Sequence, residues 1–202
     1  MKIYDDKMAP NPRRVRIFLA EKGIAVPYEQ VAIMKGEHKT PAHRARNPLE
    51  QLPVLELDDG SHIAESVAIC RYFEELNPDP PLLGRTPKEK ATIEMWQRQI
   101  EFNLYTPVAM TFRHTHAAMA SLETQIKEWG ELNRERATKA IHWLDASLAG
   151  KDFVTGPHFS IADITALCAI DFGRIWRFAI PDSCANVKRW HQSVSARPSA
   201  QA

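Results

Sequence analysis

The stretch from Asn47 to Ser66 constrains the fold of this chain more than any other. Two short apolar runs, Val54–Leu57 and His62–Ala64, flank an Asp-Gly pair, and this pattern is typical of a β-hairpin. Pro53 has no N–H to donate to a strand ladder, so it marks the start of the first strand. An amphipathic helix, Val67 to Leu76, is predicted directly after the second strand.

The two ends of this hairpin offer groups that could bind a peptide-like ligand. If the Leu52–Pro53 bond is cis, the chain turns sharply and leaves the N–H and C=O of Leu52 free to pair with an extended peptide. Glu65 and Ser66 stand at the predicted helix N-terminus, where backbone N–H groups and a hydroxyl would bind a carboxylate. The stretch therefore predicts a peptide-backbone clamp at one end and a carboxylate clamp at the other.

At these residues the chain resembles the glutathione transferases. Pro53-Val54-Leu55, then Asp59-Gly60, then Glu65-Ser66 is similar to the glutathione site of that family. The resemblance runs the length of the chain and is closest to the theta-like classes of bacteria and fungi. It implies that the Leu52–Pro53 loop pairs with the cysteinyl backbone of glutathione and that Glu65-Ser66 holds the γ-glutamyl carboxylate. The sequence departs from the family at Glu50, where glycine is common.

Composition argues against several other classes of protein. The 202 residues are 44% hydrophobic, enough for a packed core in one large or two small domains. The net charge of +1, without a basic block, argues against a nucleic-acid partner. No apolar run reaches the ~18 residues of a membrane span, and the N-terminus lacks the apolar region of a signal peptide.

Cysteine usage points to a reducing compartment. The three cysteines, Cys70, Cys168 and Cys184, are odd in number and widely spaced, so we expect neither a disulfide framework nor a metal site. The absence of a Cys-x-x-Cys motif argues against a dithiol redox enzyme. These observations predict a protein of the cytoplasm.

The first 77 residues alternate strands with helices. A βαβ unit, expected to be right-handed, precedes a polar segment with a short helix and then the hairpin and helix described above. Its elements are a strand at Lys2–Tyr4, a helix at Arg13–Lys22, a strand at Val26–Ile33 and the polar segment Lys35–Arg46. This order predicts an α/β, thioredoxin-like N-terminal domain, residues 1–77, which the resemblance implies to be glutathione-binding.

A proline-rich linker between about residues 77 and 86 separates this domain from an all-helical one, residues 87–202. Capping boxes at Thr86–Glu89 and Ser160–Asp163 predict two helix starts and have a role in folding. The predicted helices run from Pro87 to about Ala118 with a kink at Pro107, from Leu122 to Leu148, from Ile161 to Phe172 and from Ala185 to Ser195. The resemblance implies that this domain binds the electrophile.

The groups that would activate a thiol are not the side chains that are usual in this family. The family places a Tyr, Ser or Cys between the first strand and first helix, and residues 7–14 contain none of the three. Tyr4 lies one residue away from that position, so its side chain faces the other side of the sheet. The side-chain amide of Asn11 and the N–H of Arg13 remain as donors, which resembles fungal-type transferases that use an ordered water and the helix N-terminus. Alternatively, Asn11 is only a turn residue between prolines.

Other candidate site residues follow from the same resemblance. His38 and Lys39 would meet the glycine carboxylate of glutathione unless they belong to a solvated polar loop, and Gln51 could reach the tripeptide. Arg14 is expected to make a structural or interface ion pair.

The electrophile pocket is expected to include Met8, Phe112 and Trp176. His114 could act there as a general acid or hold a water molecule, or it could belong to an exposed helix face.

The function implied by the resemblance is a homodimeric transferase that conjugates the glutathione thiolate to small hydrophobic electrophiles. The dimer contact would involve the face of Arg71, Tyr72 and Glu75 together with the helix Pro87–Ile100. One alternative is a glutathione-dependent peroxidase or reductase, although a mixed-disulfide mechanism would prefer a cysteine near residue 11. Another is a non-catalytic glutathione-binding protein of the same fold.

Overall fold

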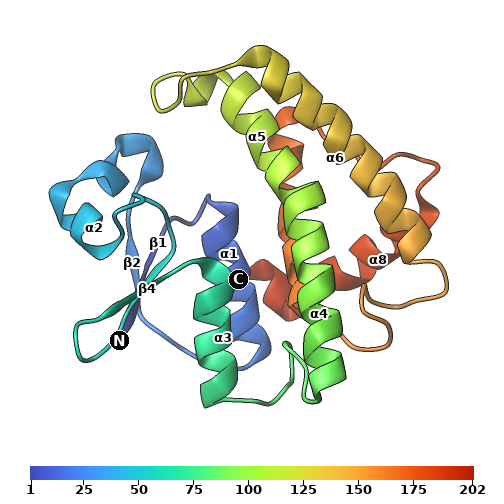
Figure 1. Ribbon diagram of the computed structural model, residues 1–202, viewed down its shortest axis with the longest axis horizontal. Helices are drawn as coiled ribbons and strands as arrows, with labels where there is room; N and C mark the ends of the chain where they lie inside the picture. Colours follow the sequence, from blue (N-terminus) through green and yellow to red (C-terminus); the bar gives the residue numbers. More distant parts are fainter. The chain divides into compact units, whose positions relative to one another are not determined.

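A computed structural model describes residues 1–202, and the chain divides into two compact units (Figure 1). Unit 1 comprises Met1–Leu82 with Gln201–Ala202, and unit 2 comprises Leu83–Ala200. The division lies between Leu82 and Leu83, in the proline-rich segment.

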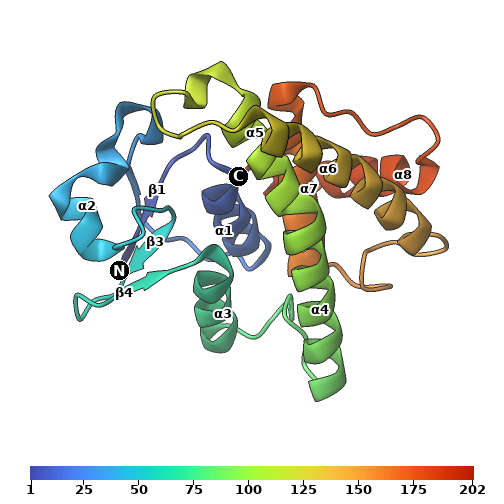
Figure 2. The ribbon, with the colours of Figure 1, turned by 45° about the horizontal axis from the view of Figure 1, so that its top comes forward.

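Unit 1 is a four-stranded mixed sheet with helices on both faces (Figures 1 and 2). Its elements are β1 (Lys2–Asp5), α1 (Pro10–Glu21), β2 (Tyr28–Gln30), 3₁₀ turns at Ile33–Lys35 and Glu37–Lys39, α2 (Pro41–Arg46), β3 (Val54–Glu56), β4 (His62–Ala64) and α3 (Ser66–Leu76). The strand order is β2-β1-β3-β4, with β1 parallel to β2 and the other two pairs antiparallel. Helices α1 and α3 pack side by side on one face, and α2 lies on the other. The predicted thioredoxin-like fold of this part is confirmed.

Alternation along β1 separates two groups of apolar side chains. Ile3 is opposite Leu55 in the ladder, and both are fully buried. Tyr4, one residue on, is opposite Val54 and belongs to a second cluster with Val31 and Leu52. Neighbouring residues of a strand point to opposite faces, so Tyr4 lies away from the face to which Ile3 points.

Two predicted boundaries in unit 1 are wrong. Helix α1 begins at Pro10, three residues before Arg13, because a proline at the first helical position needs no N–H partner. Strand β2 spans only Tyr28–Gln30, all three exposed, rather than Val26–Ile33. It is an edge strand paired only with the four-residue β1, which limits the length of its ladder.

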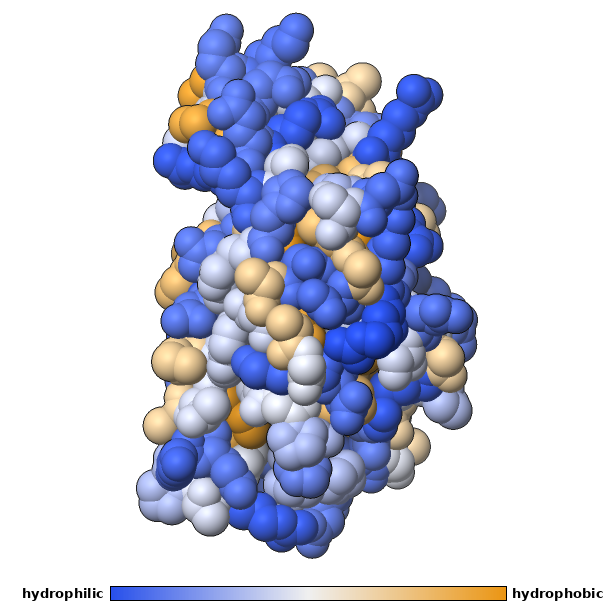
Figure 3. All heavy atoms as spheres, turned by 90° about the vertical axis from the view of Figure 1, so that its right-hand side faces the viewer, coloured by the Kyte–Doolittle hydropathy of each residue, from blue (hydrophilic) through white to orange (hydrophobic).

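Unit 2 is helical and is organised around α7. The elements that begin in it are α4 (Pro87–Ile100), a π-helical turn at Glu101–Tyr105, α5 (Thr106–Thr115), a 3₁₀ turn at Ala117–Met119, α6 (Lys127–Ser147), α7 (Ile161–Gly173), a 3₁₀ turn at Arg174–Trp176, α8 (Ala185–Ser195) and a last turn at Pro198–Gln201. Helix α7 is buried along nearly its whole length and packs against α4, α5 and α8 (Figure 2). Figure 3 shows the side of unit 2 that carries α6 and α8, where hydrophilic side chains predominate.

Both predicted capping boxes are confirmed, and the one at α7 is the centre of a buried network. One carboxylate oxygen of Asp163 accepts the N–H and the hydroxyl of Ser160 at 3.0 and 3.1 Å. The other accepts the N–H of Val154 at 2.8 Å and the indole N–H of Trp190 at 2.9 Å. Complete burial raises the pKa of Asp163 to about 6, against the opposing effect of these four donors.

The long helix predicted to run to Ala118 differs in detail from the observed one. It ends at Thr115, and its irregularity is the π-helical turn Glu101–Tyr105, which is followed by Thr106 and Pro107. Proline lacks an N–H and clashes with the carbonyl four residues earlier, and a widened turn accommodates both effects.

Helix α6 begins at Lys127 instead of Leu122. The amide of Gln125 donates to the carbonyls of Arg113 and His116 at 2.8 and 2.9 Å, and these bonds hold the preceding segment outside the helix.

No helix combines the length and the apolar character that crossing a membrane requires. All three cysteines are free and buried. No group of three or more His, Cys, Asp or Glu side chains is arranged to hold a metal ion.

Candidate functional site

The loop before β3 presents an open stretch of backbone. The Leu52–Pro53 bond is cis, and both side chains are buried. The N–H and C=O of Leu52 make no hydrogen bond within the chain. The carbonyl of Gln51, by contrast, accepts two hydrogen bonds, from His43 Nε2 and Asn47 Nδ2, both at 3.1 Å. The loop therefore has a fixed inner carbonyl and a free backbone donor and acceptor at Leu52.

The start of α3 presents a polarised hydroxyl. Ser66 is the first residue of α3, where the backbone N–H groups have no intrahelical partner. Its Oγ accepts a hydrogen bond from Arg14 Nη1 at 2.6 Å, so its own proton can be donated to a ligand. Glu65, the N-cap, has φ +68° and ψ +116°, a conformation that costs an L-residue about 1–3 kcal/mol and that clusters at functional sites.

Arg14 links Ser66, at the start of α3, to the start of α1. The side chain is 1% exposed, and its Nη1 also donates to Asn11 Oδ1 at 3.1 Å. With its oxygen facing the guanidinium, Asn11 directs its NH₂ group elsewhere and can donate it. Arg14 thus contacts residues at two helix starts, and the ion pair expected from the sequence stays a prediction.

The expectation for Arg13 is wrong. Because α1 begins at Pro10, the Arg13 N–H lies inside the helix and donates to the Ala9 carbonyl at 3.2 Å. Pro10 and Pro12 have no N–H. Asn11 is therefore the one residue in the first turn of α1 with an unused main-chain donor.

Tyr4 is unavailable to a ligand, as its strand position predicts. Its hydroxyl donates to the carboxylate of Glu56, and the Arg46 guanidinium lies 3.9 Å from the ring centre. Burial and the adjacent Glu56 raise the pKa of Tyr4.

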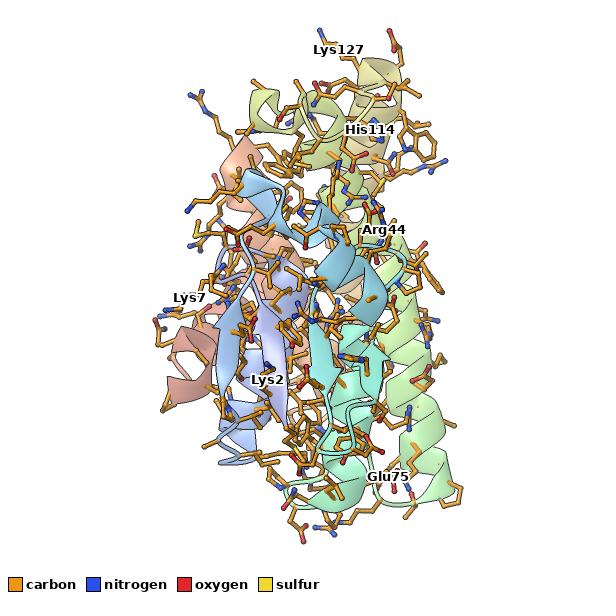
Figure 4. All side chains as sticks on the ribbon, turned by 90° about the vertical axis from the view of Figure 1, so that its left-hand side faces the viewer. Lys2, Lys7, Arg44, Glu75, His114 and Lys127 are labelled. Atoms are coloured by element: carbon orange, nitrogen blue, oxygen red, sulfur yellow. The ribbon has the colours of Figure 1, made fainter.

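The segment that leads to the cis-proline loop contains the remaining glutathione candidates. His38 is buried and Lys39 exposed on the 3₁₀ turn Glu37–Lys39, and Gln51 is exposed. Glu50, where the family often has glycine, has φ +57° in the left-handed region that favours glycine. Its carboxylate accepts from Arg44 Nε at 2.7 Å on α2 (Figure 4), so the departure from glycine coincides with an ion pair.

Unit 2 contains a hollow of about 360 Å³ at the end of α5 and the start of α6. Two of the candidate residues, His114 and Trp176, line it. His114 (Figure 4) accepts the Ile126 N–H through Nδ1 at 3.1 Å. Its Nε2 therefore carries a proton and can donate a hydrogen bond.

The other two pocket candidates lie elsewhere. Phe112 is outside the lining of the hollow and packs against Phe172, with ring centres 5.0 Å apart. Met8 belongs to unit 1, in the loop before α1, and is 80% exposed. Trp176 is held within unit 2, because its indole N–H donates to the Val108 carbonyl at 3.3 Å.

Three residues of the site have roles that the sequence reasoning missed: Arg14, His43 and Asn47. Arg14 could have been found as a charged side chain among the apolar positions of α1. His43 and Asn47 carry no comparable signal, because their importance comes from one shared carbonyl.

The comparisons with known proteins all find members of one family, and the matches extend along the chain. The family model for the glutathione S-transferase N-terminal domain matches residues 9–76, and that for the C-terminal domain matches residues 106–198. Glutathione S-transferase 2 of Saccharomyces cerevisiae is 39% identical over 205 residues, which cover all of this chain and 88% of that protein. The crystal structure of Gtt2 from Saccharomyces cerevisiae aligns with a TM-score of 0.95 at 39% identity, covering 100% of this chain and 99% of that one. A glutathione S-transferase domain-containing protein of Marinobacter aquaeolei aligns with a TM-score of 0.95 at 41% identity, covering 98% and 99%.

Proposed function

This chain belongs to the glutathione S-transferase family and is a glutathione transferase, and we propose that it conjugates the glutathione thiolate to small hydrophobic electrophiles. The observation that carries the proposal is the pair of ligand-binding features in unit 1. The Ser66 hydroxyl, with Arg14 behind it, is a carboxylate clamp, and the open backbone of Leu52 is a peptide clamp. A tripeptide with a free carboxylate at one end suits both.

In the proposed complex, the γ-glutamyl carboxylate accepts from the Ser66 hydroxyl and from the N–H groups at the start of α3. The cysteinyl backbone pairs with Leu52 beside Pro53, within reach of Gln51. Glu65, the N-cap of α3, stands beside Ser66 in this clamp. His38 and Lys39 lie on the adjacent turn and would supply the positive charge for the glycine carboxylate.

The thiolate would be held at the start of α1 by Asn11. A free thiol titrates near ~8.5, so conjugation at neutral pH requires donors that favour the ionised form. Asn11 offers its side-chain NH₂ and the unused main-chain N–H of the first turn. The buried Arg14 guanidinium beside it adds positive charge.

We assign the electrophile to Phe112 and Trp176 of unit 2, with His114 donating through Nε2 or holding a water molecule, and Met8 of unit 1 stays an expectation from the sequence. The aromatic and apolar side chains among these residues favour a hydrophobic electrophile.

Calorimetry with glutathione, followed by conjugation to an aryl halide, tests the proposal. We expect glutathione binding and an ultraviolet thiolate absorbance whose pH midpoint lies near 6.5, about two units below a free thiol. Binding with a midpoint near that of free glutathione would make this chain a non-catalytic glutathione-binding protein. Turnover of hydroperoxides without turnover of aryl halides would favour the peroxidase alternative.

We also propose that the protein is a cytoplasmic homodimer. The three free thiols suit a reducing compartment. On the helix expected to carry the dimer contact, Met95 is 47% exposed, and Phe102 in the following π-helical turn is 62% exposed. Exposed large apolar side chains of this kind are typical of association surfaces when they lie close together.

A further inference from the structure

The carbonyl of Gln51 is held by two side chains that are themselves fixed. His43 Nε2 and Asn47 Nδ2 both donate to it at 3.1 Å, and the two residues are 1% and 3% exposed. Asn47 is anchored further, since its Oδ1 accepts the Leu49 N–H at 3.1 Å and its N–H donates to the His43 carbonyl at 2.9 Å. Together these two buried donors occupy both lone pairs of the loop carbonyl.

The peptide bond that contains this carbonyl also contains the Leu52 N–H. The Gln51–Leu52 bond is trans, and in a trans peptide the C=O and the N–H point in opposite directions. With its carbonyl fixed toward His43 and Asn47, the peptide plane must direct the Leu52 N–H away from them. Nothing within the chain accepts that N–H.

We propose that His43 and Asn47 are positioning residues that aim the Leu52 N–H at the peptide backbone of bound glutathione. The proposal rests on the function proposed above and adds the groups that orient its peptide clamp. Two donors on the carbonyl also polarise the peptide group, which strengthens its N–H as a donor.

The tautomer of His43 follows from the same contacts. Nε2 faces a carbonyl, so it must carry the proton, and Nδ1 is buried without a hydrogen-bond partner. His43 therefore acts as a donor through Nε2, and any replacement must present one N–H at the reach of that atom.

Two substitutions of His43 test the proposal, because they introduce the same amide group on side chains of different length. His43→Gln places an amide N–H near the position of Nε2, whereas His43→Asn is one methylene shorter and cannot reach the Gln51 carbonyl. We expect His43→Asn to raise the KM for glutathione roughly tenfold, the effect of one lost hydrogen bond, while the KM for the electrophile and kcat at saturating glutathione change less than about twofold. His43→Gln should restore the KM to within about threefold of the wild type.

Three results would overturn the proposal. Equal losses in both KM values, or identical behaviour of the Gln and Asn variants, would mean that His43 serves only the stability of the loop. If the Asn variant does not fold, the Gln variant is compared with Asn47→Asp, which keeps the size of the side chain but replaces its donor. Unchanged glutathione KM in that variant would also refute the assignment. Failure of the wild-type protein to bind glutathione in calorimetry would refute the proposed function itself, so the two failures are distinct.

Discussion

Arg14 is the residue on which the candidate glutathione site most depends. A guanidinium that is 1% exposed is costly to bury, and here its Nη1 serves two acceptors, Ser66 Oγ and Asn11 Oδ1. Because both oxygens accept from the guanidinium, the Ser66 hydroxyl proton and the Asn11 NH₂ group point away from Arg14 and can be donated to a ligand. One buried cation therefore orients the groups proposed to hold the carboxylate and the thiolate.

Replacing Ser66 by Ala should weaken glutathione binding by about 1.5–3 kcal/mol, the scale of a hydrogen bond to a charged group. The loss comes from the hydroxyl that Arg14 orients. Calorimetry on the folded variant measures it, and Ser61→Ala, on the exposed hairpin turn, is the matched control. Undiminished affinity in a folded Ser66→Ala protein would remove this residue from the site.

Asn11→Ala should lower turnover by roughly ten- to a hundredfold, equivalent to about 1.4–2.7 kcal/mol, because the side-chain donor is lost while the main-chain N–H remains. Asn11→Asp keeps the size and the contact with Arg14 but brings a negative charge to the thiolate, so a larger loss is expected. The pH midpoint of the bound thiolate should rise in both variants. A midpoint that stays at the wild-type value would exclude Asn11 from thiolate stabilisation.

At the scale of elements, the sequence predicts a turn or a helix start best where the residues that form it are close together in the chain. The Asp59-Gly60 turn and both capping boxes were predicted correctly because the residues that form them lie within a few positions of one another. The start of α6 was predicted five residues too early, since the contacts of Gln125 with α5 and the turn after it cannot be read from local periodicity. The same limit hides His43, whose acceptor is eight residues away.

The capping box of α7 predicts a specific pH dependence. The pKa of Asp163 is raised to about 6 by burial, whereas an unfolded Asp titrates near ~3.9. Between these values the folded chain keeps a proton that the unfolded chain releases, so the contribution of Asp163 to stability falls as pH rises through this window. The total change is on the order of 3 kcal/mol.

Denaturant unfolding of the wild type and Asp163→Asn at several pH values measures this contribution. The variant should be less stable, because an amide cannot accept all four hydrogen bonds of the carboxylate. Its stability deficit should narrow as pH rises from about 4 to about 6. A deficit that widens over this range would mean that the folded state lowers the pKa of Asp163.

At the scale of the whole molecule, the electrophile pocket is the part least accessible to prediction. Two of its proposed residues, Phe112 and Trp176, are far apart in the sequence of unit 2. The aromatic residues also have structural partners of their own. The part that these side chains take in a pocket therefore depends on long-range packing, whereas the proposed glutathione clamps depend on short loops.

The proposed homodimer predicts a light-scattering mass of about twice the 23.0 kDa chain at micromolar concentration. The interface should bury more than about 1,000 Å². Met95→Glu places a charge on the α4 face and should shift the protein toward monomer. Met34→Glu, at a similarly exposed methionine outside the predicted contact, should not. A wild-type mass of one chain would rule out a stable dimer.

The two prolines of the first turn of α1 determine which anions that helix end can hold. A tetrahedral oxyanion such as phosphate usually gathers several main-chain N–H groups at a helix N-terminus, and here Pro10 and Pro12 leave only that of Asn11. A thiolate carries its charge on one large atom and needs fewer donors. Phosphate should therefore compete poorly with a thiolate for this position.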